Sequence, residues 1–192
     1  MTDARGARLP YHTIGHARLT LEDFIARLQA ARIELLVDVR AFPRSRTNPQ
    51  FNEDTLPAAL AEHGIDYLHL TELGGRRGRQ PGVAPEVNGA WDNESFHHYA
   101  DYTLQPAFRA GLERLRALGQ ERRLAIMCAE SVWWRCHRRL IADQLLATGE
   151  TVRHIMDGHV EDAKLTAFAR VQDDGRVTYP ALPASGAEPA TA

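Results

Sequence analysis

The stretch LAIMCAESVWWRCHRRLI, residues 124–141, decides the fold and contains both cysteines of the chain. Its apolar start, Leu124 to Met127, predicts a buried strand that ends on Cys128. A short polar connection follows, and a segment with helical periodicity then carries Cys136, a histidine and several arginines. In a parallel α/β sheet, the carboxyl ends of strands and the following helix N-termini line the ligand crevice. We therefore expect the candidate site at the end of this strand.

The rest of the chain alternates predicted strands with predicted helices. We expect strands at 11–14, 34–40, 65–70 and 151–156, and helices at about 20–31, 53–63 and 95–118, the last kinked or divided at Pro106. The turn Asp173-Asp174-Gly175 predicts a small C-terminal hairpin. This alternation predicts a single three-layer α/β domain with a mostly parallel sheet and helices on both faces. We expect the domain to span 10–182, between a loose leader at 1–9 and a disordered tail at 183–192.

Composition excludes several classes of protein. The formal charge of −2 over 192 residues argues against a protein that coats nucleic acid through its overall charge, although it is compatible with a local basic patch. Two cysteines cannot form a disulfide framework. The longest apolar runs, about four residues, are far shorter than the roughly 20 that span a bilayer. We expect a cytoplasmic protein with reduced thiols and no membrane partner.

Both cysteines could carry chemistry. Cys128, at a strand terminus beside Glu130, is the better candidate for a nucleophile, with Glu130 or His137 handling protons. Cys136 is expected to pack in the helix against Leu140 or Ile141, and a free cysteine is in general most often a core residue. Together Cys128, Cys136 and His137 lack the paired short spacings of structural zinc sites, so we expect no metal and no cofactor.

Arginines follow the predicted strand ends. Arg40, Arg46 and Arg138 could grip an anion, since guanidinium forks match phosphate, sulfate and carboxylate. An ion pair between Asp38 and Arg40 that ties down a loop is an equally weighted alternative. Arg76 lies in a Gly- and Pro-rich loop, residues 74–89, which is either a solvated loop or a flap over a polyanion. His16 lies near another strand end and could join the same crevice.

These motifs together resemble the bacterial family called domain of unknown function 488, over about residues 11–155. The resemblance rests on Thr13-Ile14-Gly15-His16, Asp38-Val39-Arg40, Leu73-Gly74-Gly75-Arg76, Cys128-Ala129-Glu130, Cys136-His137-Arg138 and Val152-Arg153-His154-Ile155. Ala17 departs from the serine that commonly follows the histidine. The family name implies no activity.

A looser likeness is to rhodanese-type and Cys-phosphatase domains, in which a strand ends in a catalytic cysteine and an arginine opens the next helix. Here six residues separate Cys128 from Arg135, and the stretch lacks the glycines of a tight anion cradle. This likeness concerns the fold and not the reaction.

Two functions follow. The first is a small enzyme that binds an anionic small molecule at the carboxyl edge of the sheet through its Cys, Arg, Glu and His side chains, as a cysteine-dependent transferase or hydrolase. The second is a module that binds nucleic acid through the arginine-rich loop and Trp133 or Trp134, with Cys128 structural.

Overall fold

A computed structural model describes residues 8–181, so most of the expected leader and all of the expected tail at 183–192 lie outside the described residues. The strands of the main sheet are β1 (Tyr11–Gly15), β2 (Leu35–Asp38), β3 (Asp66–His69), β4 (Leu124–Cys128), β5 (Val152–Ile155) and β6 (Val160–Asp162). The helices are α1 (Leu21–Ala30), α2 (Leu56–Ala61), α3 (Glu94–Thr103), α4 (Pro106–Glu121) and α5 (Arg138–Ala147). A separate hairpin pairs β7 (Arg170–Val171) with β8 (Val177–Thr178).

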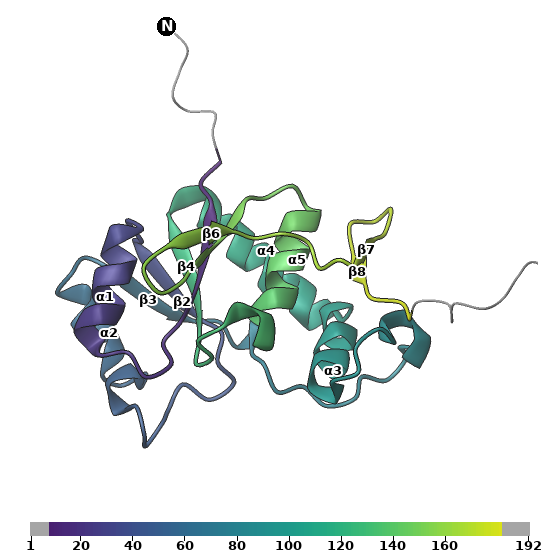
Figure 1. Cartoon of the computed structure of the whole chain (residues 1–192), viewed down its shortest axis with the longest axis horizontal. Coiled ribbons are helices and arrows are strands. Elements are labelled where there is room, and N and C mark those ends of the chain that lie inside the picture. The colour runs from purple at the N-terminus through teal and green to yellow at the C-terminus, as the bar shows by residue number, and fades with distance from the viewer. Residues whose placement is uncertain (1–7, 182–192) are drawn as a thin grey trace, which may run out of the picture.

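The main sheet has the order β3-β2-β4-β1-β5-β6 (Figure 1). All neighbouring strands run parallel except β6, which joins β5 antiparallel at one edge. The expected mostly parallel α/β sheet and C-terminal hairpin are therefore confirmed. The sequence analysis missed β6, a three-residue strand without a buried face.

Alternate side chains of the central strands face opposite sides of the sheet, where each set packs against one of the two outer layers of helices. Leu124 and Ile126 of β4 pack into the core beneath α4 and α5, whereas Ala125 and Met127 pack toward α1 and α2. Figure 1 shows α1 and α2 on one side of the sheet and α4 and α5 on the other. The helices thus cover both faces, as expected of buried parallel strands.

Helix boundaries follow local chemistry. The Thr20 hydroxyl caps α1 by accepting a hydrogen bond from the Asp23 backbone N–H at 3.1 Å. Pro106 divides the expected helix at 95–118 into α3 and α4, because it is tolerated only at the first position of a new helix.

The segment after β4 differs from the expectation. Residues Trp133–Arg135 form a short 3-10 turn and Cys136 has extended backbone angles, so α5 begins only at Arg138. Cys136 therefore lies before the helix and not within it.

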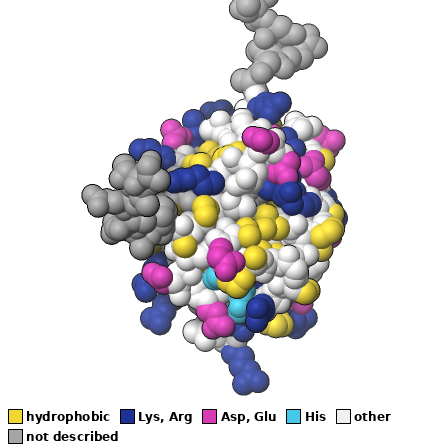
Figure 2. All heavy atoms as spheres, turned by 90° about the vertical axis from the view of Figure 1, so that its right-hand side faces the viewer, with side chains coloured by type: hydrophobic (Ala, Val, Ile, Leu, Met, Phe, Trp, Pro, Cys, Tyr) yellow, Lys and Arg dark blue, Asp and Glu magenta, His cyan; other side chains and the backbone are white. Residues whose placement is uncertain are grey.

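No helix among the described residues is long and apolar enough to cross a membrane. Where described residues form the face that carries α3 and the β7–β8 hairpin, basic and acidic side chains are interspersed with small hydrophobic areas (Figure 2).

Candidate active site

Three adjacent strands end at the site. The order β2-β4-β1 places Val39, Cys128 and His16 side by side, because the Val39 N–H donates to the Met127 carbonyl and the His16 N–H donates to the Cys128 carbonyl, both at 3.0 Å. Gly15 must be glycine here, since a Cβ would overlap the Glu130 carbonyl oxygen. The connections after these strands are thus held in one crevice.

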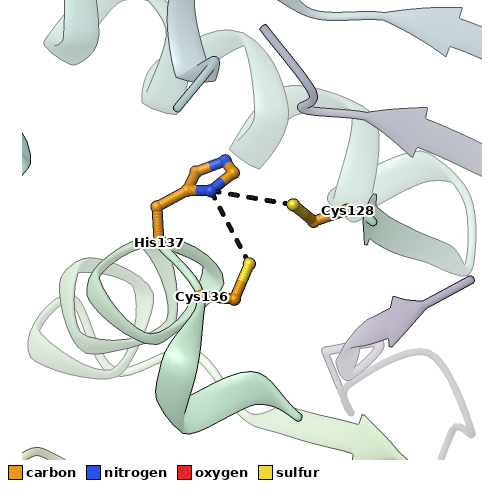
Figure 3. Close-up of side chains that lie close together, drawn as sticks. All are labelled: Cys128, Cys136 and His137. Carbon is orange, nitrogen blue, oxygen red and sulfur yellow. Dashed lines mark hydrogen bonds between the residues drawn. The ribbon is translucent and has the colours of Figure 1, made fainter. Parts of the chain in front are cut away.

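A cluster of Cys128, Cys136 and His137 occupies this crevice (Figure 3). The His137 Nε2 lies 2.9 Å from the Val39 carbonyl oxygen, which can only accept, so Nε2 carries the proton. In the neutral tautomer that this bond selects, the lone pair of Nδ1 faces the Cys128 Sγ at 3.8 Å and the Cys136 Sγ at 3.6 Å. His137 is therefore placed to accept a proton from either thiol.

The ring of His137 is fixed from two further sides. A Cβ on Gly75 would lie 2.9 Å from its Nδ1, so only glycine allows the loop to approach this closely. Tyr99 of α3 packs edge-to-face on the ring with centroids 5.0 Å apart, and its hydroxyl donates to the Leu73 carbonyl. The glycine-rich loop and α3 thus position the imidazole.

Arg138 lies beneath the cluster and is almost fully buried. Its Nε donates to the Cys136 Sγ at 3.3 Å, and its Nη2 donates to the Glu130 carbonyl at 2.6 Å. Arg138 therefore holds the connection after β4 and places a positive charge beside Cys136, where it cannot reach a substrate directly.

The pKa values of the two thiols are shifted in opposite directions. The hydrogen bond with Cys136 and burial hold the pKa of the Cys128 thiol well above its usual value. Burial alone would raise the pKa of Cys136 too, but the hydrogen bond from Cys128, the positive charge and Nδ1–H of a His137 ring that has taken up a proton, and the charge of Arg138 outweigh burial and hold that pKa well below its usual value. Of the two cysteines, Cys136 is therefore the one whose thiolate form its surroundings favour, although the sequence pattern predicted that it packs in a helix.

A cavity of about 260 Å³ opens over the cluster. Its lining combines the cluster with two arginines, a carboxylate and an aromatic wall: Gly75, Arg76, Ser95, Phe96, Tyr99, Cys128, Glu130, Arg135, Cys136 and His137. Arg76 and Arg135 are exposed, and Arg76 adopts a left-handed backbone angle, φ 58°. Cys128 is 8% exposed and Cys136 3%. The cavity offers one thiol and two exposed guanidinium groups to a small anion.

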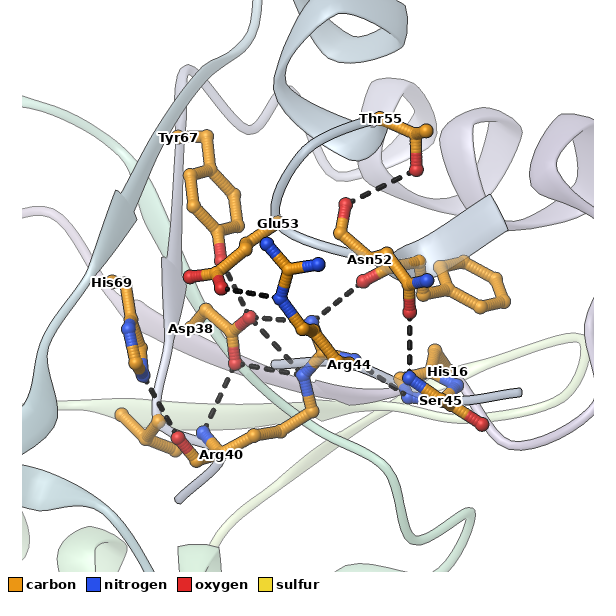
Figure 4. Close-up of polar contacts among 12 residues, drawn as sticks. His16, Asp38, Arg40, Arg44, Ser45, Asn52, Glu53, Thr55, Tyr67 and His69 are labelled. Atoms are coloured by element: carbon orange, nitrogen blue, oxygen red, sulfur yellow. Dashed lines mark hydrogen bonds and ion pairs between the residues drawn. The ribbon is translucent and has the colours of Figure 1, made fainter. Parts of the chain in front are cut away.

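Arg40 instead belongs to a separate polar network (Figure 4). Its Nη2 lies 2.6 Å from Asp38 Oδ2 and 2.7 Å from the Phe51 carbonyl oxygen, and its side chain is 5% exposed. The Tyr67 hydroxyl donates to the same Asp38 oxygen at 2.7 Å. The ion-pair alternative therefore describes Arg40, whose donors are committed within the protein.

His16 also belongs to this network. Its Nδ1–H donates to the Ala17 carbonyl at 3.0 Å, its Nε2 accepts from Arg40 Nη1 at 3.4 Å, and its ring stacks on Phe51. Burial, and secondly the charge of Arg40, lower its pKa to about 4. His16 is a neutral structural histidine in this arrangement.

The structure thus brings Cys128, Glu130, His137 and Arg76 to one cavity, with Arg138 directly behind the cluster. Arg40 and His16 have structural partners, and Arg46 is exposed and makes no hydrogen bond or ion pair with residues 8–181. The sequence analysis missed Arg135, Gly75 and Tyr99 as site residues. Arg135 could have been found as part of the cysteine-containing stretch, but Tyr99 carried only a core signal.

The two tryptophans have different surroundings. Trp133 stacks on His154 with centroids 4.3 Å apart, and its indole N–H donates to Glu161 at 2.5 Å. Trp134 is partly exposed and packs edge-to-face on Trp133. His154 therefore covers one face of the Trp133 ring, which leaves Trp134 as the more accessible of the two tryptophans.

Comparison with known proteins identifies the family of the chain. The model of the family described as "Domain of unknown function DUF488" matches residues 20–145, about two thirds of the chain. The chain belongs to the DUF488 family. The match includes all three residues of the cluster together with Gly75, Arg76 and Arg138. No curated protein and no solved structure matches the chain, so the likeness to rhodanese-type domains finds no support there.

Proposed function

We propose that this DUF488 protein is an enzyme that uses a cysteine thiolate on a small anionic substrate bound in the cavity over Cys128, Cys136 and His137. The carrying observation is the imidazole whose proton is fixed on Nε2, so that Nδ1 faces both sulfurs at the floor of an open cavity. A nucleophile beside an oriented base is the usual arrangement of covalent catalysis.

The roles follow from exposure and charge. Cys128 is the nucleophile because it is the more exposed sulfur, and its proton passes to His137 Nδ1 or to the Cys136 thiolate. Arg138 stabilises the negative charge that the pair retains. Arg76 and Arg135 hold the anionic group of the substrate, and Glu130 exchanges protons at the cavity mouth.

Two alkylating reagents that differ in charge test this proposal. Iodoacetamide is neutral and iodoacetate is an anion of almost the same size, so their rate ratio at Cys128 reports the field of the cavity. We expect rapid alkylation of Cys128 in the native protein and a ratio that favours iodoacetate more than it does for a free cysteine. Peptide mapping by mass spectrometry resolves Cys128 from Cys136.

The matched variants are Arg76→Gln and Arg135→Gln, with Arg79→Gln as the control from the same loop outside the cavity lining. Each cavity variant lowers the iodoacetate-to-iodoacetamide ratio about threefold to tenfold, as expected for removing one nearby charge, and the control leaves it unchanged. No alkylation of either cysteine before unfolding refutes the proposal. Fast alkylation of Cys128 with an unchanged ratio in the cavity variants would support a reactive thiol but refute an anionic substrate.

A further inference from the structure

We propose that Cys128, Cys136 and His137 also form a binding site for one Zn²⁺ ion, which silences the thiol by coordinating it. As a metal site the inference stands without the proposed function, and as regulation it rests on that function. The sequence spacing argued against a metal site, because structural zinc sites usually have two short paired spacings. The fold supplies by tertiary structure what the spacing lacks, since the ligands come from the end of β4 and the residues before α5.

The ligand atoms are already close to the required geometry. Tetrahedral zinc with Zn–S near 2.3 Å and Zn–N near 2.0 Å places neighbouring ligand atoms about 3.5–3.8 Å apart. The two Sγ–Nδ1 distances are 3.8 and 3.6 Å, and all three ligand atoms lie within 4.8 Å of one another. The Sγ–Nδ1 distances already match tetrahedral zinc, and the two sulfurs need to approach each other by at most about 1 Å.

The imidazole is also oriented as a metal ligand. In metal sites the nitrogen that does not bind usually donates its proton to a carboxylate or a backbone carbonyl. The His137 Nε2–H donates to the Val39 carbonyl at 2.9 Å, which leaves the Nδ1 lone pair directed at the two sulfurs. The close approach of Gly75 to this ring restricts any rotation that would turn Nδ1 away.

The charges favour a divalent cation over an empty pair of thiols. Zinc binding displaces the thiol protons into solvent and leaves two thiolates, whose charges balance that of the ion. Arg138 can keep its hydrogen bond to the Cys136 sulfur and stabilise that thiolate. The thiolate and imidazole donors select a soft or borderline ion such as Zn²⁺ over Mg²⁺ or Ca²⁺.

The fourth coordination position faces the cavity, because the cavity lining includes all three ligands. Water or the Glu130 carboxylate can complete the tetrahedron there. With zinc bound, the Cys128 sulfur is a ligand and no longer a free nucleophile. Zinc and alkylating reagents therefore compete for the same atom.

The experiment titrates the chelator-treated full-length protein with Zn²⁺ against a chromophoric chelator, and separately with Co²⁺. We expect one Zn²⁺ per chain, and a Co²⁺ spectrum with tetrahedral ligand-field bands and thiolate-to-cobalt charge transfer. Variants Cys128→Ser, Cys136→Ser and His137→Ala weaken zinc binding by about 100-fold or more, since each removes a ligand of a three-residue site. His63→Ala, which changes an exposed histidine outside the site, binds as the wild type.

Zinc protects both cysteines against iodoacetamide if the inference is correct. Wild-type protein that binds Co²⁺ without thiolate charge transfer, or binds no zinc, overturns it, and this readout does not depend on the folding of any variant. Fast alkylation of Cys128 without zinc binding refutes only the metal site. Zinc binding by a protein whose metal-free thiols are inert refutes only the proposed function.

Discussion

The Asp38–Arg40 network and the Cys128–Cys136–His137 cluster lie at the ends of neighbouring strands, but they differ in how completely their polar groups are paired. In the network, the carboxylate of Asp38 accepts bonds from Arg40 and Tyr67, and the guanidinium also reaches the Phe51 carbonyl. In the cluster, the three reactive atoms have mainly one another as partners, at 3.6–3.8 Å from Nδ1 to sulfur. The comparison teaches that a completed network stabilises the fold, whereas an incompletely paired cluster can accept a ligand.

Asp38→Ala should have the largest effect on stability. The substitution leaves the Arg40 charge buried without its carboxylate, and breaking a buried pair typically costs about 3–5 kcal/mol. Urea unfolding of the variant measures this loss. Asp157→Ala is the matched control, because Asp157 is 94% exposed in its pair with Arg27 and should cost under about 1 kcal/mol. A cost for Asp38→Ala as small as that of the control would show that the network is not structural.

Lowering the pH should have the second-largest effect on stability. Burial lowers the pKa of His16 from 6.5 in the unfolded chain to about 4, so the unfolded chain takes up the proton first as the pH falls. Stability from this group is complete above about pH 6.5 and is lost progressively toward pH 4, by at most about 3 kcal/mol. His12 and His154, both with pKa lowered to about 4 primarily by burial, add losses of the same sign.

Urea unfolding at pH 7 and pH 4.5 measures this loss. The variant His16→Asn should show a smaller loss between the two pH values than the wild type. An equal loss in both proteins would assign the acid sensitivity to other groups.

Tyr67→Phe should cost less than Asp38→Ala, because it removes one donor to a carboxylate that keeps its bonds to Arg40. Hydrogen bonds to charged groups contribute about 1.5–3 kcal/mol, and we expect the lower end here. Tyr102→Phe removes a hydrogen bond to a neutral carbonyl and should cost about 1 kcal/mol. Chemical unfolding of the two variants measures both losses of unfolding free energy. A larger loss for Tyr102→Phe than for Tyr67→Phe would contradict the expected order.

His137→Asn should have a small effect on stability and the largest effect on reactivity. The side chain is partly exposed and contributes one hydrogen bond to the Val39 carbonyl, so the loss of stability should stay under about 1.5 kcal/mol. Alkylation of Cys128 should slow by about tenfold or more without its base. If His137→Asn is much less stable than the wild type but its Cys128 is alkylated at the normal rate, the role of the cluster is structural and not reactive.

The fold was predictable where the local sequence pattern agrees with the place of the residues in the folded structure. The apolar runs at Leu35–Val37 and Leu124–Met127 favour burial on both faces, and Pro106 was expected to kink or divide a helix, so these features matched the prediction. The edge strand β6 gave no such signal, because its backbone pairing with β5 requires no apolar side chain.

The site was predictable only as far as the strand ends. The sequence placed Cys128, Glu130 and His137 together because one short segment carries them. It could not decide whether Arg40 meets a ligand or Asp38, since that depends on a side-chain direction. It placed Cys136 inside the helix, because helical periodicity does not show that α5 starts two residues later, at Arg138.

The left-handed backbone of Arg76 has a consequence for how this protein would change under selection. A non-glycine residue in that conformation carries a strain of about 1–2 kcal/mol that glycine would not have. Screening a library for thermal stability alone should therefore recover Arg76→Gly, and the same library screened for anion capture should reject it. The strain at this one position would set the two screens against each other.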